Sequence, residues 1–162
     1  MPTAVITGAG RGLGAVLADR LAAAGYDVVR TDITGAEVAL DVSDADACRD
    51  LASGVRPDIW INNAGVLGAG DAATQPDAVI QRVISTNLLG TINGTRAAVA
   101  VMRQRCDGTG DGHVINIGSL ASWVPVPGEC VYAATKAGMR SCTLGLRAEL
   151  DDAGVSGVPL AG

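Results

Sequence analysis

The stretch AVITGAGRGLG, residues 4 to 14, passes from an apolar, β-branched run into a glycine-rich turn. Ala4 to Thr7 has the composition of a short buried strand. After the turn, apolar residues recur at helical spacing, at Leu13, Val16, Leu17 and Leu21. Gly25 follows the last turn of this helix and is expected to be its C-terminal cap. The sequence therefore predicts a strand that leads through glycines directly into a helix.

The rest of the chain repeats this alternation of strand and helix. Further strands are predicted over Tyr26 to Asp32, Val38 to Val42, Asp58 to Gly65 and His113 to Ser119. Helical spacing marks residues 79–84, 88–105 and 139–150, and Ser43 is expected to cap a short helix after the third strand. Strands separated by helices form βαβ units, so we expect one α/β domain over residues 1–162, with a parallel sheet covered on both faces.

The glycine-rich turn, Thr7 to Gly14, lies where a strand is followed by a helix. Glycines permit a tight turn and let the backbone approach a pyrophosphate, while the helix N-terminus offers free N–H groups and a positive dipole end. Asp32 ends the next strand, where a ribose-binding carboxylate belongs in such a site. Together these features favour nucleotide binding over an ordinary structural turn.

Two charged residues bear on which dinucleotide binds. A carboxylate at Asp32 would accept hydrogen bonds from the ribose hydroxyls of NAD and repel the 2′-phosphate of NADP. Arg11, within the turn, has the opposite effect because it could pair with that phosphate. Asp32 is the better placed of the two, so we expect NAD as the cofactor in preference to NADP.

Composition excludes several other classes of protein. The 162 residues are 48% hydrophobic and 18% charged, as in an ordinary globular protein. A net charge of −5 without a basic cluster argues against nucleic-acid binding. The four cysteines and single histidine lack the spacing of a disulfide framework or a zinc site, which indicates reduced thiols in the cytoplasm and no bound metal. The sequence contains neither a signal peptide nor a membrane-spanning run, so no membrane partner is expected.

Four motifs occur in order along the chain: T-G-x-x-x-G-x-G at Thr7 to Gly14, N-N-A-G at Asn62 to Gly65, a serine at Ser119, and Y-x-x-x-K at Tyr132 and Lys136. In this combination the chain resembles the short-chain dehydrogenase/reductase family, over the region from the first strand to about Leu150. The resemblance implies a Rossmann-type, doubly wound parallel sheet. It also implies hydride transfer between a nicotinamide and a small-molecule alcohol or carbonyl compound.

The resemblance also assigns roles to four catalytic residues. Tyr132 would exchange the proton of the substrate hydroxyl, and Lys136 would favour the phenolate form of Tyr132 and bind the nicotinamide ribose. Ser119 would hold the substrate oxygen, and Asn87 would complete a proton relay through water. Positions i and i+4 of a helix share a face, so Tyr132 and Lys136 can point into one cleft. Taken alone, a Tyr-x-x-x-Lys pair on a helix is more often structural, with Tyr132 as a packing aromatic.

The remaining roles concern the cofactor. Asp41 and Val42 would flank the adenine, and Asn63, Ala64 and Gly65 would line the cofactor and brace the sheet. The full set of expected cofactor-binding residues is Gly8, Arg11, Gly12, Leu13, Gly14, Asp32, Ile33, Asp41, Val42, Asn63, Ala64, Gly65, Tyr132 and Lys136.

The chain departs from the family pattern after the last helix. Family members continue with further strands and a loop that covers the substrate, so we expect the usual C-terminal strand and lid to be absent, with at most a stunted strand over Val155 to Leu160. Turnover could then be slow or absent. Two alternatives to an enzyme therefore stay open: a non-catalytic NAD(P)-binding protein, and a truncated relic. Small residues on the last helix, such as Gly138 and Gly145, favour a homodimer or homotetramer.

Overall fold

The computed structural model describes residues 1–104, 112–151 and 156–159. Its strands are β1 (Thr3–Thr7), β2 (Asp27–Asp32), β3 (Val38–Ala39), β4 (Ile59–Asn62), β5 (His113–Asn116) and β6 (Ser156–Pro159). Its helices are α1 (Gly12–Ala23), α2 (Ala45–Val55), α3 (Asp77–Ile84), a π-helical turn η1 (Ser85–Leu89), α4 (Gly90–Gln104), a 3-10 turn η2 (Leu120–Ser122) and α5 (Cys130–Asp151). The predicted loop at residues 106–111 lies outside the described residues.

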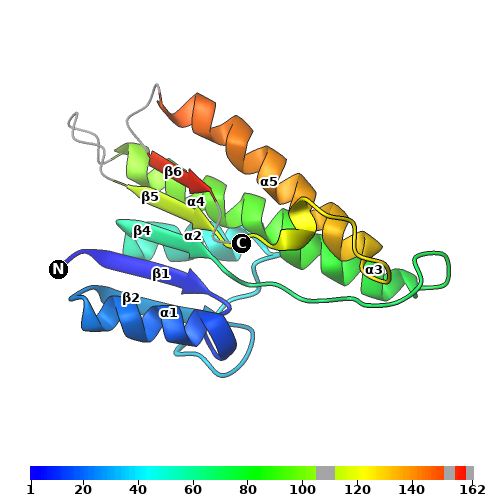
Figure 1. Cartoon of the computed structure of the whole chain (residues 1–162). Coiled ribbons are helices and arrows are strands. Elements are labelled where there is room, and N and C mark those ends of the chain that lie inside the picture. Colours follow the sequence, from blue (N-terminus) through cyan, green and yellow to red (C-terminus); the bar gives the residue numbers. More distant parts are fainter. Residues whose placement is uncertain (105–111, 152–155, 160–162) are drawn as a thin grey trace.

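The six described strands form one parallel sheet in the order β3-β2-β1-β4-β5-β6 (Figure 1). This is the strand order of a doubly wound Rossmann sheet, so the predicted fold class is confirmed. The expected stunted strand forms as β6, which pairs in parallel with β5. Gly157 and Pro159 are tolerated there because β6 lies at the edge of the described sheet, where no further ladder needs the missing proline N–H.

Apolar side chains of β1 point alternately to the two faces of the sheet, as the period of a strand requires. Val5 packs with Trp60 and with residues of α2 and α4 on one face, while Ile6 packs with Ala18 of α1 on the other. All of these side chains are buried. Helices therefore cover both faces of the sheet, which is why the strands read as almost continuous apolar runs.

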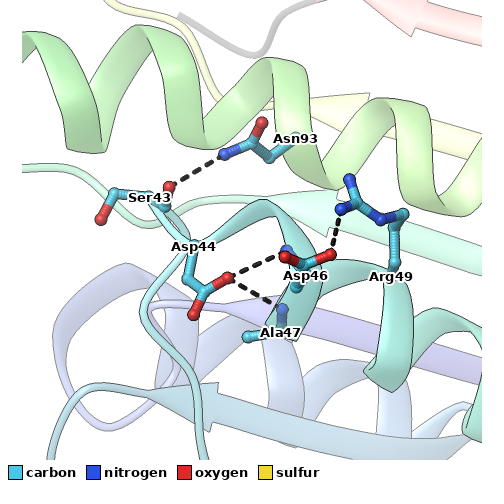
Figure 2. Close-up of polar contacts among 6 residues, drawn as sticks. All are labelled: Ser43, Asp44, Asp46, Ala47, Arg49 and Asn93. Atoms are coloured by element: carbon cyan, nitrogen blue, oxygen red, sulfur yellow. Dashed lines mark hydrogen bonds and ion pairs between the residues drawn. The ribbon is translucent and has the colours of Figure 1, made fainter.

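Two local predictions need correction or refinement. The third strand, predicted over Val38 to Val42, is limited to Val38–Ala39. The N-cap of α2 is Asp44 and not Ser43: Asp44 Oδ1 accepts hydrogen bonds from the N–H groups of Asp46 (2.9 Å) and Ala47 (3.1 Å), as Figure 2 shows. The hydroxyl of Ser43, one residue before the N-cap, instead donates to Asp41 Oδ1 at 2.7 Å.

The end of α1 follows the prediction. Gly25 has φ +89°, directly after the C-cap residue Ala24, and its N–H donates to the carbonyl of Ala22 at 3.0 Å. Glycine is favoured here because other residues are strained in this left-handed conformation. Within the described part of the chain, no helix is both long and apolar enough to cross a lipid bilayer.

Candidate functional site

A cavity of about 420 Å³ opens at the carboxyl ends of the central strands. Ligands bind at this edge in open parallel sheets, and the volume is in the range of small-molecule sites. Eleven of the fourteen residues expected to bind the cofactor line the cavity: Gly8, Arg11, Leu13, Gly14, Asp32, Ile33, Asp41, Val42, Asn63, Ala64 and Gly65. The other three, Gly12, Tyr132 and Lys136, are not part of its lining.

The glycine-rich turn is packed so tightly at Gly8 and Gly14 that side chains are excluded from these two positions. Gly8 has φ +66°, and a Cβ on it would lie 2.7 Å from the Cα of Ala64. A Cβ on Gly14, in the first turn of α1, would lie 2.2 Å from the carbonyl oxygen of Gly8. Gly12 has φ +59° and faces open space. The turn is thus a glycine cradle at a helix N-terminus, where backbone N–H groups are available for an anion.

Asn63 joins the end of β4 to this turn. Its Nδ2 donates to the carbonyls of Thr7 (3.0 Å) and Gly8 (2.9 Å), and its own N–H donates to Thr7 Oγ1 at 3.0 Å. The N–H of Ala64 donates to the same hydroxyl at 3.1 Å. These bonds hold the carboxyl ends of β1 and β4 together, which fixes one wall of the cavity.

The carboxylate of Asp32 is held at the end of β2 by two backbone N–H groups. Oδ2 accepts from Gly10 at 3.1 Å, and Oδ1 accepts from Ile33 at 2.7 Å. Asp32 is half-buried and lines the cavity. The geometry leaves a fixed anionic group beside the glycine turn, with acceptor capacity remaining on both oxygens.

The inner end of the cavity meets the residues expected to be catalytic. Gly65 lines the cavity, and a Cβ on it would lie 3.5 Å from Asn87 Oδ1 and 3.9 Å from Lys136 Nζ. Asn87 is fully buried in η1, where its Oδ1 accepts from Val66 N–H at 2.8 Å and its Nδ2 donates to the Val66 carbonyl at 2.9 Å. The helix widens to a π-turn at this residue, a feature frequent at functional sites.

Lys136 lies on α5 with only 5% of its surface exposed. Its Nζ donates to the carbonyl of Ile117 at 2.8 Å and lies 5.9 Å from the centre of the Tyr132 ring. Burial lowers the pKa of Lys136 below its ordinary value, because the charged ammonium is poorly solvated there. No carboxylate among the described residues forms an ion pair with it. A buried, unpaired ammonium is suited to an anion or an additional acceptor supplied by a ligand.

Ser119 and Tyr132 lie on neighbouring elements, since η2 packs against α5. Ser119 precedes η2, and its Oγ accepts from the N–H of Ala121 at 3.2 Å. Within the described residues, the Tyr132 hydroxyl forms no hydrogen bond to protein, and Ser119 makes no bond to Tyr132. Trp123 is 66% exposed, and the Arg140 guanidinium lies 3.8 Å from the centre of its ring.

Asn62 does not serve neighbouring backbone groups but belongs to a buried side-chain network. Its Oδ1 accepts from Trp60 Nε1 at 2.8 Å, and its Nδ2 donates to Asn116 Oδ1 at 2.7 Å. Asn116 in turn donates to the hydroxyl of Thr143 on α5 at 2.8 Å. The network fastens β4 and β5 to α5, the helix that carries Lys136. A single sequence shows two asparagines at strand ends but not that they pair.

Four residues that line the cavity were not predicted from the sequence: Leu40, Val66, Arg82 and Thr86. Leu40 and Val66 are the chain neighbours of the expected residues Asp41 and Gly65, which explains their place in the lining. Arg82 and Thr86 come from α3 and η1; Arg82 falls within the predicted helix over residues 79–84, whereas Thr86 lies between the two predicted helices, so no local signal pairs them.

Comparisons with known proteins agree with this architecture. A family model described as short chain dehydrogenase matches residues 33–158. The chain belongs to the short-chain dehydrogenase family. It is 38% identical to the probable oxidoreductase EphD of Mycobacterium tuberculosis, over 93% of this chain and 28% of that protein. It is 34% identical to the serine 3-dehydrogenase of Rhizobium radiobacter, over 94% of this chain and 68% of that one.

Solved short-chain dehydrogenases share the fold closely. The crystal structure of a metagenomic short-chain oxidoreductase in complex with NADP superposes with a TM-score of 0.89 and 31% identity, over 99% of this chain and 82% of that chain. The chain thus spans between about a quarter and four fifths of the relatives named here. The glycine cradle, the fixed Asp32 carboxylate and the lack of side chains at Gly8 and Gly14 fit the pyrophosphate and ribose of a dinucleotide.

Proposed function

We propose that residues 1–162 act as one dinucleotide-binding domain of an oxidoreductase, which transfers a hydride between NAD(H) and a secondary alcohol or ketone. The observation that carries this proposal is the position of Gly65. It lies at the inner end of the cavity, next to both Asn87 and the buried ammonium of Lys136. A dinucleotide that begins at the glycine turn would therefore end beside the residues proposed to be catalytic.

When bound, the nicotinamide would accept or supply the hydride. The chain itself would move the proton. Tyr132 would take the proton from the substrate hydroxyl during oxidation and return it during reduction. Lys136, 5.9 Å from the ring of Tyr132, would stabilise the phenolate by its positive charge. Because Lys136 is buried, its charge is less screened by water than that of a surface lysine.

Ser119 and Asn87 would have supporting roles. Ser119 Oγ accepts one hydrogen bond from Ala121, which leaves its own O–H free to donate to a substrate oxygen. The side chain of Asn87 is held on both sides by Val66. Asn87 would therefore position the inner end of the site and direct a water relay toward Lys136.

We propose NAD over NADP because of Asp32. Its carboxylate is fixed beside the glycine turn, where it would accept from ribose hydroxyls and repel a 2′-phosphate. The metagenomic relative is described in complex with NADP. The family fold alone therefore does not decide between NAD and NADP, and the preference is measured on this chain.

Turnover assays on the purified chain test the enzymatic proposal. The panel contains secondary alcohols, ketones and serine, each with NAD(H) and NADP(H), for the wild type and Tyr132→Phe. We expect wild-type turnover with at least one substrate, and a loss of turnover of at least roughly 100-fold in the variant, which still binds NAD. NAD binding without any turnover in the wild type would contradict the proposed enzymatic activity and would support a non-catalytic dinucleotide-binding protein.

We also propose a homo-oligomer and a cytoplasmic location. On α5, Ala134, Ser141 and Gly145 are exposed together with Leu144, whereas Gly138 faces Leu88 of the same chain. This exposed stripe of small and apolar residues would suit packing against a second copy. A monomeric mass by light scattering would contradict the oligomer. Cys48, Cys130 and Cys142 are free thiols, which suits a reducing compartment.

A further inference from the structure

The cavity has a wall that the motifs of the sequence do not account for. Arg82 at the end of α3 and Thr86 in η1 line it together with the segment from Leu40 to Val42. Arg82 is an exposed arginine at a cavity whose lining also includes buried Leu40 and Val42.

The position of this wall is set by contacts further along the same helix. Asn93 Nδ2 donates to the carbonyls of Val42 (3.0 Å) and Ser43 (3.3 Å), and Figure 2 shows the bond to Ser43. Gly90 lies so close to Val42 that a Cβ on it would be 2.5 Å from Val42 Cγ2. These contacts fix the first turn of α4 against the segment that is expected to flank the adenine.

Arg82, Thr86 and Gly90 are spaced by four residues along the continuous helix formed by α3, η1 and α4. Such spacing places them along one face, and the face is the one that meets Val42. Arg82 comes about two turns before Gly90 on this helix, so it lines the cavity further from the contact with Val42 than Thr86 does, and its side chain is exposed.

The guanidinium of Arg82 has no partner among the described residues, which show no hydrogen bond or ion pair to it. Asp32 and Asp41 also line the cavity, and neither forms an ion pair with Arg82; Asp32 accepts from Gly10 and Ile33, and Asp41 accepts twice from Ser43. An unpaired planar cation over an apolar wall is suited to the face and ring nitrogens of a purine.

We propose that Arg82 binds the adenine ring of the dinucleotide and closes the outer end of its site. This inference rests on the proposed function, since it requires that the cavity takes an adenine dinucleotide. The guanidinium would lie over the adenine face or donate to its ring nitrogens, with Val42 lining the same cavity. Arg82 would then contribute to the binding of NAD and ADP alike, because both carry the same adenosine diphosphate group.

Calorimetric titration with NAD, NADP and ADP tests this on the wild type, Arg82→Ala, Arg82→Lys and the control Arg103→Ala. Arg103 is an exposed arginine in the last turn of α4 and lies outside the cavity lining. Its replacement by alanine removes the same charge as Arg82→Ala. We expect Arg82→Ala to weaken NAD and ADP by the same factor, roughly 3- to 30-fold, from the usual strength of such contacts. Arg82→Lys should remain weakened at least threefold, and the control should bind within twofold of the wild type.

Each other result overturns the inference. NAD affinity within twofold of the wild type in Arg82→Ala would exclude a direct contact. Full recovery in Arg82→Lys would indicate charge attraction to the phosphates in place of adenine recognition. A loss confined to NADP would place Arg82 at the 2′-phosphate. These results leave the proposed function intact, whereas a wild type that binds none of the three ligands would overturn both proposals. Thermal melts of all variants confirm that they are folded.

Discussion

Replacement of Gly14 by alanine tests the packing of the glycine turn. Gly14 is buried in the first turn of α1, where alanine would ordinarily stabilise the helix by about 1 kcal/mol. Here the added Cβ would lie 2.2 Å from the carbonyl oxygen of Gly8 and 2.4 Å from Asn63 Nδ2. Both distances are far below van der Waals contact, so α1 or the turn has to move.

The cost follows from what that movement breaks. Separating α1 from the turn stretches the bonds from Asn63 Nδ2 to the carbonyls of Gly8 and Thr7, each of which contributes about 0.5–1.5 kcal/mol. Overpacking adds about 1–3 kcal/mol. After the gain from helix propensity, Gly14→Ala should lower the free energy of unfolding by about 1–5 kcal/mol. For a chain of this length that is a fall in Tm of roughly 2–20 °C.

The assay is thermal and urea unfolding of the wild type, Gly14→Ala and the control Gly54→Ala. Gly54 is exposed within α2, and a Cβ on it would meet nothing within 4 Å. The control should therefore gain about 0.5–1 kcal/mol. Opposite signs for the two substitutions are the expected result. If Gly14→Ala is as stable as the wild type, the tight approach of α1 to the turn is wrong.

Three further predictions concern charged and titrating groups. Asp32→Ser should weaken NAD roughly 10- to 100-fold and favour NADP relative to NAD; an unchanged ratio of their Kd values, measured by calorimetry, would remove Asp32 from cofactor selection. Burial, aided by Asp44 and Asp41, raises the pKa of Cys48 to about 11, so a brief iodoacetamide pulse at pH 8 should label exposed Cys130 and spare Cys48, as read by peptide mass mapping. Lys136 is the only lysine, and its lowered pKa means that the unfolded chain holds the proton to higher pH than the folded chain. The free energy of unfolding should then rise with pH between the two pKa values, and the single NMR signal of labelled lysine should titrate below 10.5; a midpoint at or above that value would contradict the burial of its ammonium.

Much of the fold follows from local sequence features. The glycine-rich turn after Thr7, the positive φ at Gly25 and the alternation of strand and helix each have a local physical cause. The N-cap of α2 could not be chosen in this way, because Ser43 and Asp44 are both good caps at adjacent positions. In the structure the Ser43 hydroxyl donates to Asp41, two residues earlier, and Asn93 of the distant helix α4 donates to the Ser43 carbonyl, which leaves Asp44 as the cap.

The site divides in the same manner. Gly8, Gly14 and Asp32 were identified from a strand, a turn and the end of the next strand, and all line the cavity. Arg82 was not identified from the sequence. Its place depends on how α4 packs against Val42, and the contact from Asn93 of α4 to Val42 joins residues about fifty positions apart. The π-turn at Asn87 also has no local signal, since it depends on contacts with Val66 and Thr135.

The central claim is that the cavity beside the glycine turn binds a nicotinamide dinucleotide that extends to Lys136. Hydrogen–deuterium exchange of the wild type with and without saturating NAD tests it most directly, because it reports on each segment separately. We expect slower exchange in peptides covering residues 8–14, 32–42, 63–66 and 117–136, with residues 45–55 of α2 unchanged. Absence of protection at residues 8–14, or protection confined to segments outside the cavity, would contradict the account.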